Sequence, residues 1–409
     1  SYRWAKALSG LVNLTVLGMS RPTPVPLEEQ LPGVEVAEWP EPPLLRRAER
    51  FNAMAKPGYP LFYRRVRRWV QGELAKGRRF DVAHQLMPQA ARYPCPFRGL
   101  GVPYIVGPLG GALATPEGFR SEVGSASWYT RLRALDLWRF RYDPWLRGSY
   151  READMILGVA PYFEQTLSAI PLRRFEPVLE LGIDALPDPV ARPIGPGLRL
   201  LHVGRGVRTK GLRDAVRAMA ELRDLADVTL TSAGGGEETA IARAEAEALG
   251  IADRITFLGR IPHDQVEDLY RTSDIFVFPS FREPAGGVLY EAMRWGLPVI
   301  TVDYGGPAYI VDDSCGIRLP VSTPEALKRD VARAVRDLYA NPERLRALSH
   351  GAHAKLAREG LWSAKAAHLV CLYRDVAQAP PWGPSDLCQH PLLNVARAPK
   401  RAQPNVFRT

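Results

Sequence analysis

Apolar residues in this chain occur mainly as short runs, and stretches with a helical repeat of apolar positions separate these runs. The first half of the chain holds candidate strands at 14–19, 80–86, 102–108, 155–160 and 177–183. The second half holds further ones at 198–204, 228–234, 255–259, 274–280, 297–304 and 316–320. Short apolar runs that alternate with helices are typical of buried parallel strands. The pattern therefore predicts an α/β protein in which each series forms its own parallel sheet, covered by helices on both faces.

A Pro- and Gly-rich stretch separates the two series of strands. It predicts a linker at 186–198, between an N-terminal domain of residues 1–185 and a C-terminal domain of residues 199–362. Each domain is expected to be Rossmann-like. Ligands of such folds bind beyond the carboxyl ends of the parallel strands. We therefore expect the site in a cleft between the two domains.

The ends of the chain follow other patterns. The first residues predict a helix at 2–9 and a strand at 11–18. Helices are predicted near the other end at 323–339, 342–358 and 363–379. The last stretch, 380–409, is Pro-containing and rich in polar and basic residues, so we expect a poorly ordered tail.

Composition limits the possible environments of the protein. The 409 residues are 46% hydrophobic and 24% charged, as in an ordinary globular protein, and no apolar run is long enough to span a membrane. We see no signal peptide, and we expect a cytoplasmic protein. The cysteines are scattered singly, at Cys95, Cys315, Cys371 and Cys388. The net charge of +10 favours an anionic partner, which could be a nucleotide sugar, an anionic membrane or nucleic acid.

Two glutamates eight positions apart, Glu283 and Glu291, flank the most informative segment. Residues 284–287 predict a tight turn, and 288–295 predict a helix that ends at a glycine. Glu283 would thus lie at a helix N-terminus, where bare N–H groups attract anions such as a diphosphate. Two carboxylates beside an anion site suit a sugar nucleotide, because each can accept hydrogen bonds from hydroxyl pairs. Two solvated helix glutamates are the alternative on spacing alone.

This segment resembles the E-x7-E signature of retaining glycosyltransferases of family 4, which have the GT-B architecture. The segments 201–220, 228–238, 255–280 and 304–320 resemble the family in the same order and spacing. The resemblance is strong over about 199–330 and weaker over 1–198. It implies two Rossmann-like domains facing across a cleft and a last helix that crosses back to the N-terminal domain. It also implies one strand and one Gly-rich loop before residue 1.

The resemblance implies roles for residues of the donor site. Arg205 and Lys210, on a loop that bends at Gly204, would stabilise the negative charge on the departing diphosphate. Glu283 would bind hydroxyls of the donor sugar, and Glu291 would hold the ribose. The other expected contacts to the nucleotide sugar are Gly204, Gly235, Gly236, Leu258, Gly259, Ala285, Gly286, Gly287 and Val288. Without the motifs, the two cations would be read as solvated surface residues.

The acceptor side is less well defined. His84 ends a predicted strand and matches a histidine often seen in the family, although a lone strand-end histidine can equally be structural. Gly110 and Gly111 stand where many relatives carry a histidine that faces the acceptor. These glycines have no side chain that could act as a general base. The base would then be the donor's own phosphate or a group elsewhere in the protein.

Two segments, 61–79 and 127–150, combine arginines with aromatic residues. They suit the surface of an anionic membrane, or they pack their aromatics into the core while the arginines reach solvent. Binding of nucleic acid is a third alternative, but no motif for it accompanies them.

These patterns predict a retaining glycosyltransferase that moves a hexose from a nucleotide diphosphate sugar to a glycan, lipid-linked or small-molecule acceptor. The seven histidines are dispersed and no acidic triplet occurs, so no metal and no cofactor besides the donor is expected. A GT-B sugar-nucleotide epimerase and an inactive sugar-nucleotide-binding relative are the alternatives. Peripheral attachment to the inner face of the membrane is an alternative to a purely cytoplasmic location.

Overall fold

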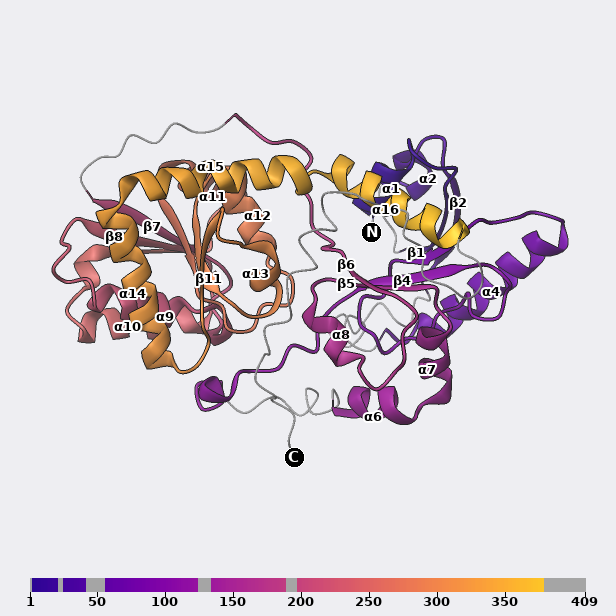
Figure 1. The fold of residues 1–409 in the computed structure, drawn as a ribbon, viewed down its shortest axis with the longest axis horizontal. Coiled ribbons are helices and arrows are strands. Elements are labelled where there is room, and N and C mark those ends of the chain that lie inside the picture. The colour runs from indigo at the N-terminus through magenta and orange to yellow at the C-terminus, as the bar shows by residue number, and fades with distance from the viewer. Residues whose placement is uncertain (1, 21–24, 42–55, 124–133, 189–196, 379–409) are drawn as a thin grey trace.

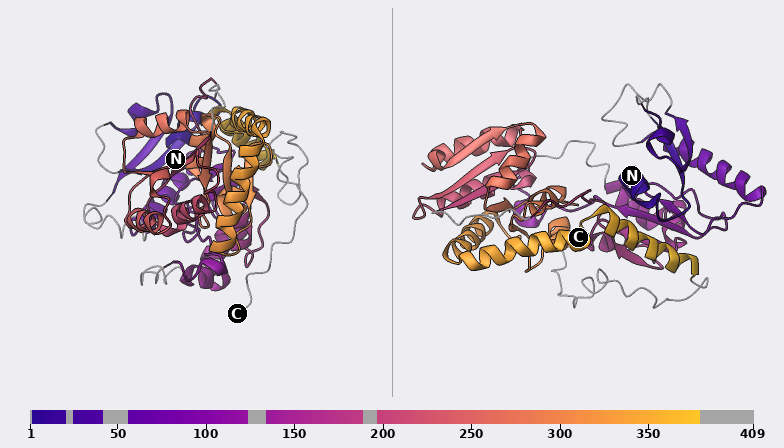
Figure 2. Two further views of the ribbon diagram at one scale, coloured as in Figure 1. Left: turned by 90° about the vertical axis from the view of Figure 1, so that its left-hand side faces the viewer. Right: turned by 90° about the horizontal axis from the view of Figure 1, so that it is seen from above.

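The computed structural model describes residues 2–20, 25–41, 56–123, 134–188 and 197–378. Its two bodies stand side by side in Figure 1, each built on a parallel sheet. Helices α15 and α16 run along one side of both bodies in the right-hand view of Figure 2. The expected tail at 380–409 and most of the expected linker lie outside the described residues.

The C-terminal body contains a six-stranded sheet in the order β12-β11-β10-β7-β8-β9, with every neighbouring pair parallel. Its strands are β7 (Leu198–Val203), β8 (Val228–Ala233), β9 (Ile255–Gly259), β10 (Ile275–Phe278), β11 (Val299–Val302) and β12 (Gly316–Leu319). Each of them lies within a predicted apolar run. The central strands β10 and β11 have the clearest pattern, because a strand covered on both faces is apolar at nearly every position.

Helices cover both faces of this sheet. They are α9 (Leu212–Ala220), α10 (Glu237–Ala248), α11 (His263–Thr272), α12 (Gly287–Arg294), α13 (Gly305–Ile310), α14 (Pro324–Ala340) and α15 (Pro342–Glu359). Leu200 packs in one hydrophobic cluster with α9, α10 and α14, while its neighbour Leu201 packs in another with α12 and α15. Successive side chains of a strand point to opposite faces, so one strand contributes to two cores.

The N-terminal body differs from the single sheet that the pattern predicted. Its four-stranded parallel sheet contains β3 (Ala83–Gln85), β4 (Tyr104–Leu109), β5 (Met155–Gly158) and β6 (Phe175–Pro177). A separate parallel pair contains β1 (Thr15–Ser20) and β2 (Glu35–Pro40). No prediction covered β2, because its polar residues and partial exposure hide the apolar pattern of a buried strand.

The strand predicted at 177–183 is wrong in its position. β6 ends at Pro177, and the chain then leaves the sheet toward the C-terminal body. Leu179 and Leu181 pack in the C-terminal cluster that contains α12 and α15, so these residues are apolar because they connect two bodies. Ile183 then forms an isolated parallel bridge with Leu361.

The N-terminal body carries α1 (Tyr2–Leu8), α2 (Leu27–Gln30), α4 (Tyr59–Ala75), α6 (Ala134–Tyr142), α7 (Pro144–Arg151) and α8 (Tyr162–Thr166). The last helix, α16 (Trp362–Gln378), also packs on this body. Its Trp362 ring meets the Trp4 ring edge-on at 5.1 Å. Figure 1 shows α16 in yellow beside α1, so the end of the described chain returns to its beginning.

Candidate functional site

The loop after β7, residues 204–211, lies at the carboxyl end of the C-terminal sheet. It contains a short 3-10 turn, η3 (Arg208–Lys210), followed by Gly211, whose φ of +80° suits glycine. A Cβ on Gly211 would also approach the Pro279 carbonyl oxygen to 2.3 Å. The loop can therefore turn back into α9 only because residue 211 has no side chain.

Lys210 and Glu283 meet between two loops. The Lys210 ammonium donates to the Glu283 carboxylate, and both side chains are only 13% exposed. The other oxygen of Glu283 accepts the backbone N–H groups of Ala285, at 3.2 Å, and Gly286, at 3.1 Å. The carboxylate is thus held by three donors in one orientation.

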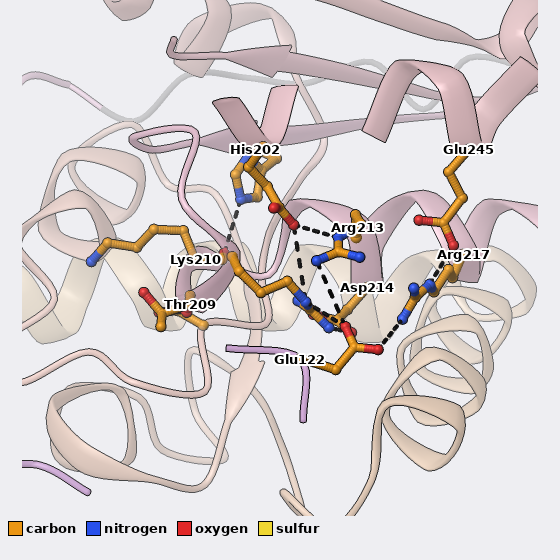
Figure 3. Close-up of polar contacts among 11 residues, drawn as sticks. Glu122, His202, Thr209, Lys210, Arg213, Asp214, Arg217 and Glu245 are labelled. Carbon is orange, nitrogen blue, oxygen red and sulfur yellow. Dashed lines mark hydrogen bonds and ion pairs between the residues drawn. The ribbon is translucent and has the colours of Figure 1, made fainter. Parts of the chain in front are cut away.

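His202, on β7, contacts the backbone of the same loop. Burial lowers the pKa of His202 to about 4, so the imidazole is neutral near pH 7, and its Nε2 lies 3.1 Å from the Lys210 carbonyl oxygen. Figure 3 shows this contact and the Lys210 side chain extending away from it. Arg205, by contrast, is exposed, and its guanidinium has no hydrogen-bond or ion-pair partner within the part of the chain that the structure describes.

Glu291 lies on α12, one turn after the first residues of that helix. It is exposed, and one carboxylate oxygen accepts a hydrogen bond of 3.1 Å from the buried Tyr270 hydroxyl. The amide of Gly286 is already used by Glu283. Gly287 and Val288 belong to the first turn of α12, where backbone N–H groups have no intrahelical acceptor. Their amides are the ones that suit an anionic ligand.

The glycines after β8 act mainly on a neighbouring loop. A Cβ on Gly234 would lie 1.8 Å from the Gly204 carbonyl oxygen, and one on Gly236 would lie 2.2 Å from that of Gly206. Gly235 accepts the Gly206 N–H at 2.9 Å. The triplet therefore lets the loops after β7 and β8 pack backbone against backbone, which the spacing of the glycines did not reveal.

At the end of β9, Leu258 is 40% exposed and Gly259 has a φ of +65°. No heavy atom lies within 4 Å of a Cβ placed on Gly259, other than its chain neighbours. The Gly259 carbonyl oxygen accepts the Gly234 N–H at 2.7 Å. These residues border the glycine loops at the carboxyl edge of the sheet.

On the N-terminal side, both nitrogens of His84 are engaged. Nδ1 lies 2.7 Å from the Tyr373 hydroxyl, and Nε2 lies 2.8 Å from the Gly107 carbonyl oxygen. Desolvation lowers the pKa of His84 to about 4. These contacts favour the structural reading of this histidine over a role in binding an acceptor.

Gly110 and Gly111 follow the last residues of β4. The Gly110 N–H donates to the Gln89 carbonyl oxygen at 2.9 Å, and the Gly111 carbonyl oxygen accepts from the Tyr162 hydroxyl at 3.1 Å. Burial raises the pKa of Tyr162, and the charge of Glu283 adds to that effect. The glycine loop of the N-terminal body is thus near the Lys210–Glu283 pair.

Two further residues were not predicted: Tyr162, which contacts this loop, and Glu180, whose charge acts on Tyr162. Tyr162 begins α8, and Glu180 lies in the crossing after β6. Burial raises the pKa of Glu180, and its carboxylate contributes to the raised pKa of Tyr162. Neither residue belongs to a motif, and the proximity of Tyr162 to Glu283 depends on how the two bodies meet.

The bodies also meet through the segment after Gly111. The Tyr304 hydroxyl donates to the Ala114 carbonyl oxygen at 3.0 Å, and Arg282 donates to the Thr115 hydroxyl at 3.1 Å. Arg282 directly precedes Glu283. The chain between Gly111 and residue 123 therefore borders the segments after β10 and β11 that contain Arg282 and Tyr304.

Across the described ranges, no group of three or more His, Cys, Asp or Glu side chains has the arrangement of a metal site. Over the same ranges, none of the helices has the length and apolar character needed to cross a bilayer.

Comparison with known proteins gives a family match within the C-terminal body. Residues 194–353 match the family model of glycosyl transferases, group 1. This match contains Arg205, Lys210, Glu283 and Glu291, whereas His84 and the Gly110–Gly111 pair lie outside it.

A curated relative is the D-inositol 3-phosphate glycosyltransferase of Segniliparus rotundus. It is 33% identical over 201 residues, which cover 48% of this chain and 41% of that protein. The chain thus spans less than half the length of this relative.

Two solved structures resemble the arrangement of both bodies. Sucrose-phosphate synthase from Thermosynechococcus elongatus superposes with a TM-score of 0.60 at 21% identity, over 91% of this chain and 92% of that one. Anabaena HepE in complex with UDP and glucose gives a TM-score of 0.55 at 15% identity, over 91% and 94%. The GT-B fold expected from the sequence is confirmed.

Proposed function

We propose that this protein is a retaining glycosyltransferase that moves a hexose from a nucleoside diphosphate sugar to an acceptor. The contact between Lys210 and Glu283 carries the proposal, because it joins the loops after β7 and β10 into one charged site at the carboxyl edge of the sheet. The match to glycosyl transferases group 1 covers both residues.

In this proposal the cations act on the leaving group. Arg205 and Lys210 stabilise the charge that grows on the diphosphate as the anomeric carbon–oxygen bond breaks. The flexible Lys210 side chain can turn from Glu283 to a phosphate oxygen, while Arg205 already lies exposed on the same loop. The first-turn amides of Gly287 and Val288 add donors to the same anion.

The carboxylates act on hydroxyl groups. Glu283, held by the Ala285 and Gly286 amides, keeps an oxygen for hydroxyls of the donor sugar once Lys210 turns away. Glu291, oriented by Tyr270, accepts hydrogen bonds from the ribose. Leu258 and Gly259 border the place of the base. UDP sugars are the first donors to test, since the similarly folded HepE was solved with UDP and glucose.

For the acceptor, the glycine loop at Gly110 and Gly111 offers backbone rather than side chains. The acceptor hydroxyl attacks the anomeric carbon on the face from which the diphosphate departs, and its proton passes to a departing phosphate oxygen. This balance requires no protein side chain as base. Tyr162 contacts the loop, Glu180 is close enough to act on the pKa of Tyr162, and both side chains can orient a carbohydrate acceptor.

A lipid-linked acceptor at an anionic membrane is part of the proposal. Exposed aromatic residues on the N-terminal body support it: Trp138 and Tyr142 on α6 are 59% and 56% exposed, and Trp145 on α7 is 51% exposed. Arg141 is exposed beside them. On α4, by contrast, Val66 is buried, and Arg67 donates to backbone carbonyl oxygens, which favours the core reading for that segment.

The test is a thermal-shift screen with UDP, GDP and ADP sugars, followed by turnover of a radiolabelled donor with and without candidate acceptors. A ligand that binds only the folded state raises the melting temperature. Label transferred to an acceptor supports the proposal. Conversion to an isomeric sugar nucleotide without acceptor would indicate an epimerase, and binding without turnover would indicate an inactive relative.

A further inference from the structure

We propose that residues 113–123, which we call the strap, position the donor loop from the acceptor side, with Glu122 as the positioning residue. This inference rests on the proposed function, because it concerns the same donor loop. The strap begins two residues after Gly111 and ends, in the described chain, beside α9. In Figure 1 it is the violet segment with a short helix that leaves the N-terminal body and lies near α9 and α14.

The strap is built into the C-terminal core. Phe119, in the 3-10 turn η2 (Glu117–Phe119), is fully buried and belongs to the cluster that includes α9, α10 and α14. Its ring stacks on that of Phe281 with centroids 4.3 Å apart. A Cβ on Gly118 would lie 1.9 Å from the Ser322 carbonyl oxygen, so only glycine permits this approach. The packing anchors the strap on the donor body.

Glu122 reaches the donor loop through Arg208. The Arg208 Nε donates to Glu122 at 2.6 Å, while its two terminal nitrogens donate to Asp214 at 2.5 and 2.9 Å. Arg208 is only 8% exposed and lies over the Phe281 ring at 5.1 Å. Nε and both terminal nitrogens of Arg208 therefore donate to these two acids, and this fixes the orientation of the guanidinium group.

Arg208 lies in the same turn as Lys210, so its fixed orientation affects Lys210. Arg208 begins η3, the turn that ends at Lys210, so the two side chains share one turn. The Arg208 side chain is fixed between α9 and the strap, while the Lys210 side chain extends to Glu283. Figure 3 shows Lys210 and the acidic cluster on opposite sides of this turn. Holding Arg208 therefore limits the positions that Lys210 can take.

Glu122 joins a wider charge cluster, which Figure 3 displays. Its carboxylate also approaches Arg217 at 3.4 Å and Arg213 at 3.8 Å, both on α9. These arginines are held in turn by acids of α10, since Arg217 pairs with Glu245 and Arg213 with Glu238, each at 2.5 Å. Glu122 is the member that comes from the N-terminal body. Its removal leaves the C-terminal pairs in place.

The arrangement couples the two substrate sides. A shift of the Gly110–Gly111 loop on binding an acceptor displaces the strap. Because Glu122 of the strap contacts Arg208, the displacement changes the position of Arg208 and of Lys210 in the same turn. Coupling between two sites is reciprocal, so donor binding also favours the acceptor-competent position of the glycine loop. A strap that merely fastened the two bodies together would affect global stability and leave the donor loop unchanged.

The test compares Glu122→Gln with Glu245→Gln by hydrogen exchange in the full chain. Glu122→Gln removes the strap's charge with little change of shape, and Glu245→Gln removes a charge from the same cluster without touching the strap. The reporting amides are Gly206, Lys210 and Gly211, which donate to backbone oxygens within or beside the loop. We expect their exchange to accelerate about tenfold in Glu122→Gln, the scale of one charged hydrogen bond, and to stay at the wild-type rate in Glu245→Gln.

A second readout is the affinity for UDP, GDP and ADP by calorimetry, where we expect a loss of about threefold to tenfold in Glu122→Gln and none in the control. Wild-type exchange in Glu122→Gln, or equal acceleration in both variants, would overturn the positioning role. Glu122→Asp, which keeps the charge but is too short to reach, should behave like Glu122→Gln. If no nucleotide binds the wild-type protein, the proposed function fails, while hydrogen exchange still decides the role of the strap.

Discussion

Lys210 and Glu283 lie 73 positions apart in the chain, yet their side chains form one ionic contact. They meet because β7 and β10 are neighbours in the sheet, so the loops at their carboxyl ends share one edge. The motifs that contain these residues could be recognised in the sequence, since glycines and two cations mark the loop after β7, and two glutamates with glycines between them mark the loop after β10. Glu122 and Tyr162 could not, because neither has a motif and each depends on contact between the two bodies.

The first residue-scale prediction concerns Lys210. Lys210→Ala should lower turnover by at least roughly a hundredfold, the scale of losing one preorganised charge contact to the leaving group. Lys328→Ala is the matched control, since Lys328 forms an ion pair with Glu221 at the C-terminal end of α9, away from the Lys210 end, and should keep wild-type turnover. Steady-state release of nucleoside diphosphate measures both. A Lys210→Ala protein with near wild-type turnover would remove this residue from the site.

The second concerns pH and His202. Its pKa is lowered by burial from 6.5 to about 4, so between these values the unfolded chain binds a proton that the folded protein does not. The free energy of unfolding therefore falls as pH falls through this window, by about 2 kcal/mol at pH 5 for one such histidine. His84, with the same lowered pKa, adds to the loss.

Urea unfolding at pH 7.5 and pH 5 measures the difference. His202→Gln should shrink the pH-dependent part, even if it lowers stability at both pH values. The exposed His263 provides the control, and His263→Gln should keep the wild-type difference. An unchanged pH difference in His202→Gln would contradict the assignment of this loss to the buried imidazole.

At the scale of elements, the central strands of the C-terminal sheet could be predicted and the margins of the N-terminal body could not. β10 and β11 are buried at every position, which leaves an unmistakable apolar run. β2 has only exposed and half-buried residues, and the apolar run after β6 belongs to the segment that crosses between the bodies and forms no strand. The apolar pattern of a segment indicates that its residues are buried, but it does not indicate which part of the protein they pack against.

The exposed aromatics of α6 and α7 lead to a prediction about membranes. The protein should pellet with vesicles of phosphatidylcholine and phosphatidylserine at low salt and less with phosphatidylcholine alone. Each cation near such a surface contributes about 1 kcal/mol, and screening over about 3 Å at 1 M salt should release the protein. Trp138→Ser with Trp145→Ser should weaken the binding.

The matched control is Ile241→Ser, which removes an exposed apolar side chain, 47% exposed, from α10 of the C-terminal body. It should pellet like the wild-type protein. Equal and negligible pelleting on both kinds of vesicle at low salt would contradict membrane binding by α6 and α7.

At the scale of the whole molecule, the GT-B arrangement places the charged loops after β7 and β10 of one body near the glycine loop of the other. The fold class followed from the alternation of strands and helices, but the contacts across the bodies did not. Phe119 illustrates the reason: its burial in the core of the opposite body is a property of the assembled chain, and one aromatic residue in a loop gives no sign of it.

Transfer should need no divalent metal, because in the proposed function Arg205 and Lys210 supply the positive charge at the diphosphate. Turnover should persist in excess EDTA at the wild-type rate. Complete loss of turnover in EDTA, restored by magnesium or manganese, would contradict this role of the two cations. A metal-dependent glycosyltransferase assayed in parallel confirms that the chelator is effective.

The most direct test of the account is the anomeric configuration of the transferred sugar. The protein is incubated with the α-linked hexose donor selected by thermal shift and with an acceptor that takes up label, and the first-formed product is analysed by proton NMR. The account predicts an α-linked product, which keeps the configuration of the donor. A β-linked product would contradict a retaining transfer, and a sugar nucleotide recovered unchanged with every acceptor and donor would contradict transfer altogether.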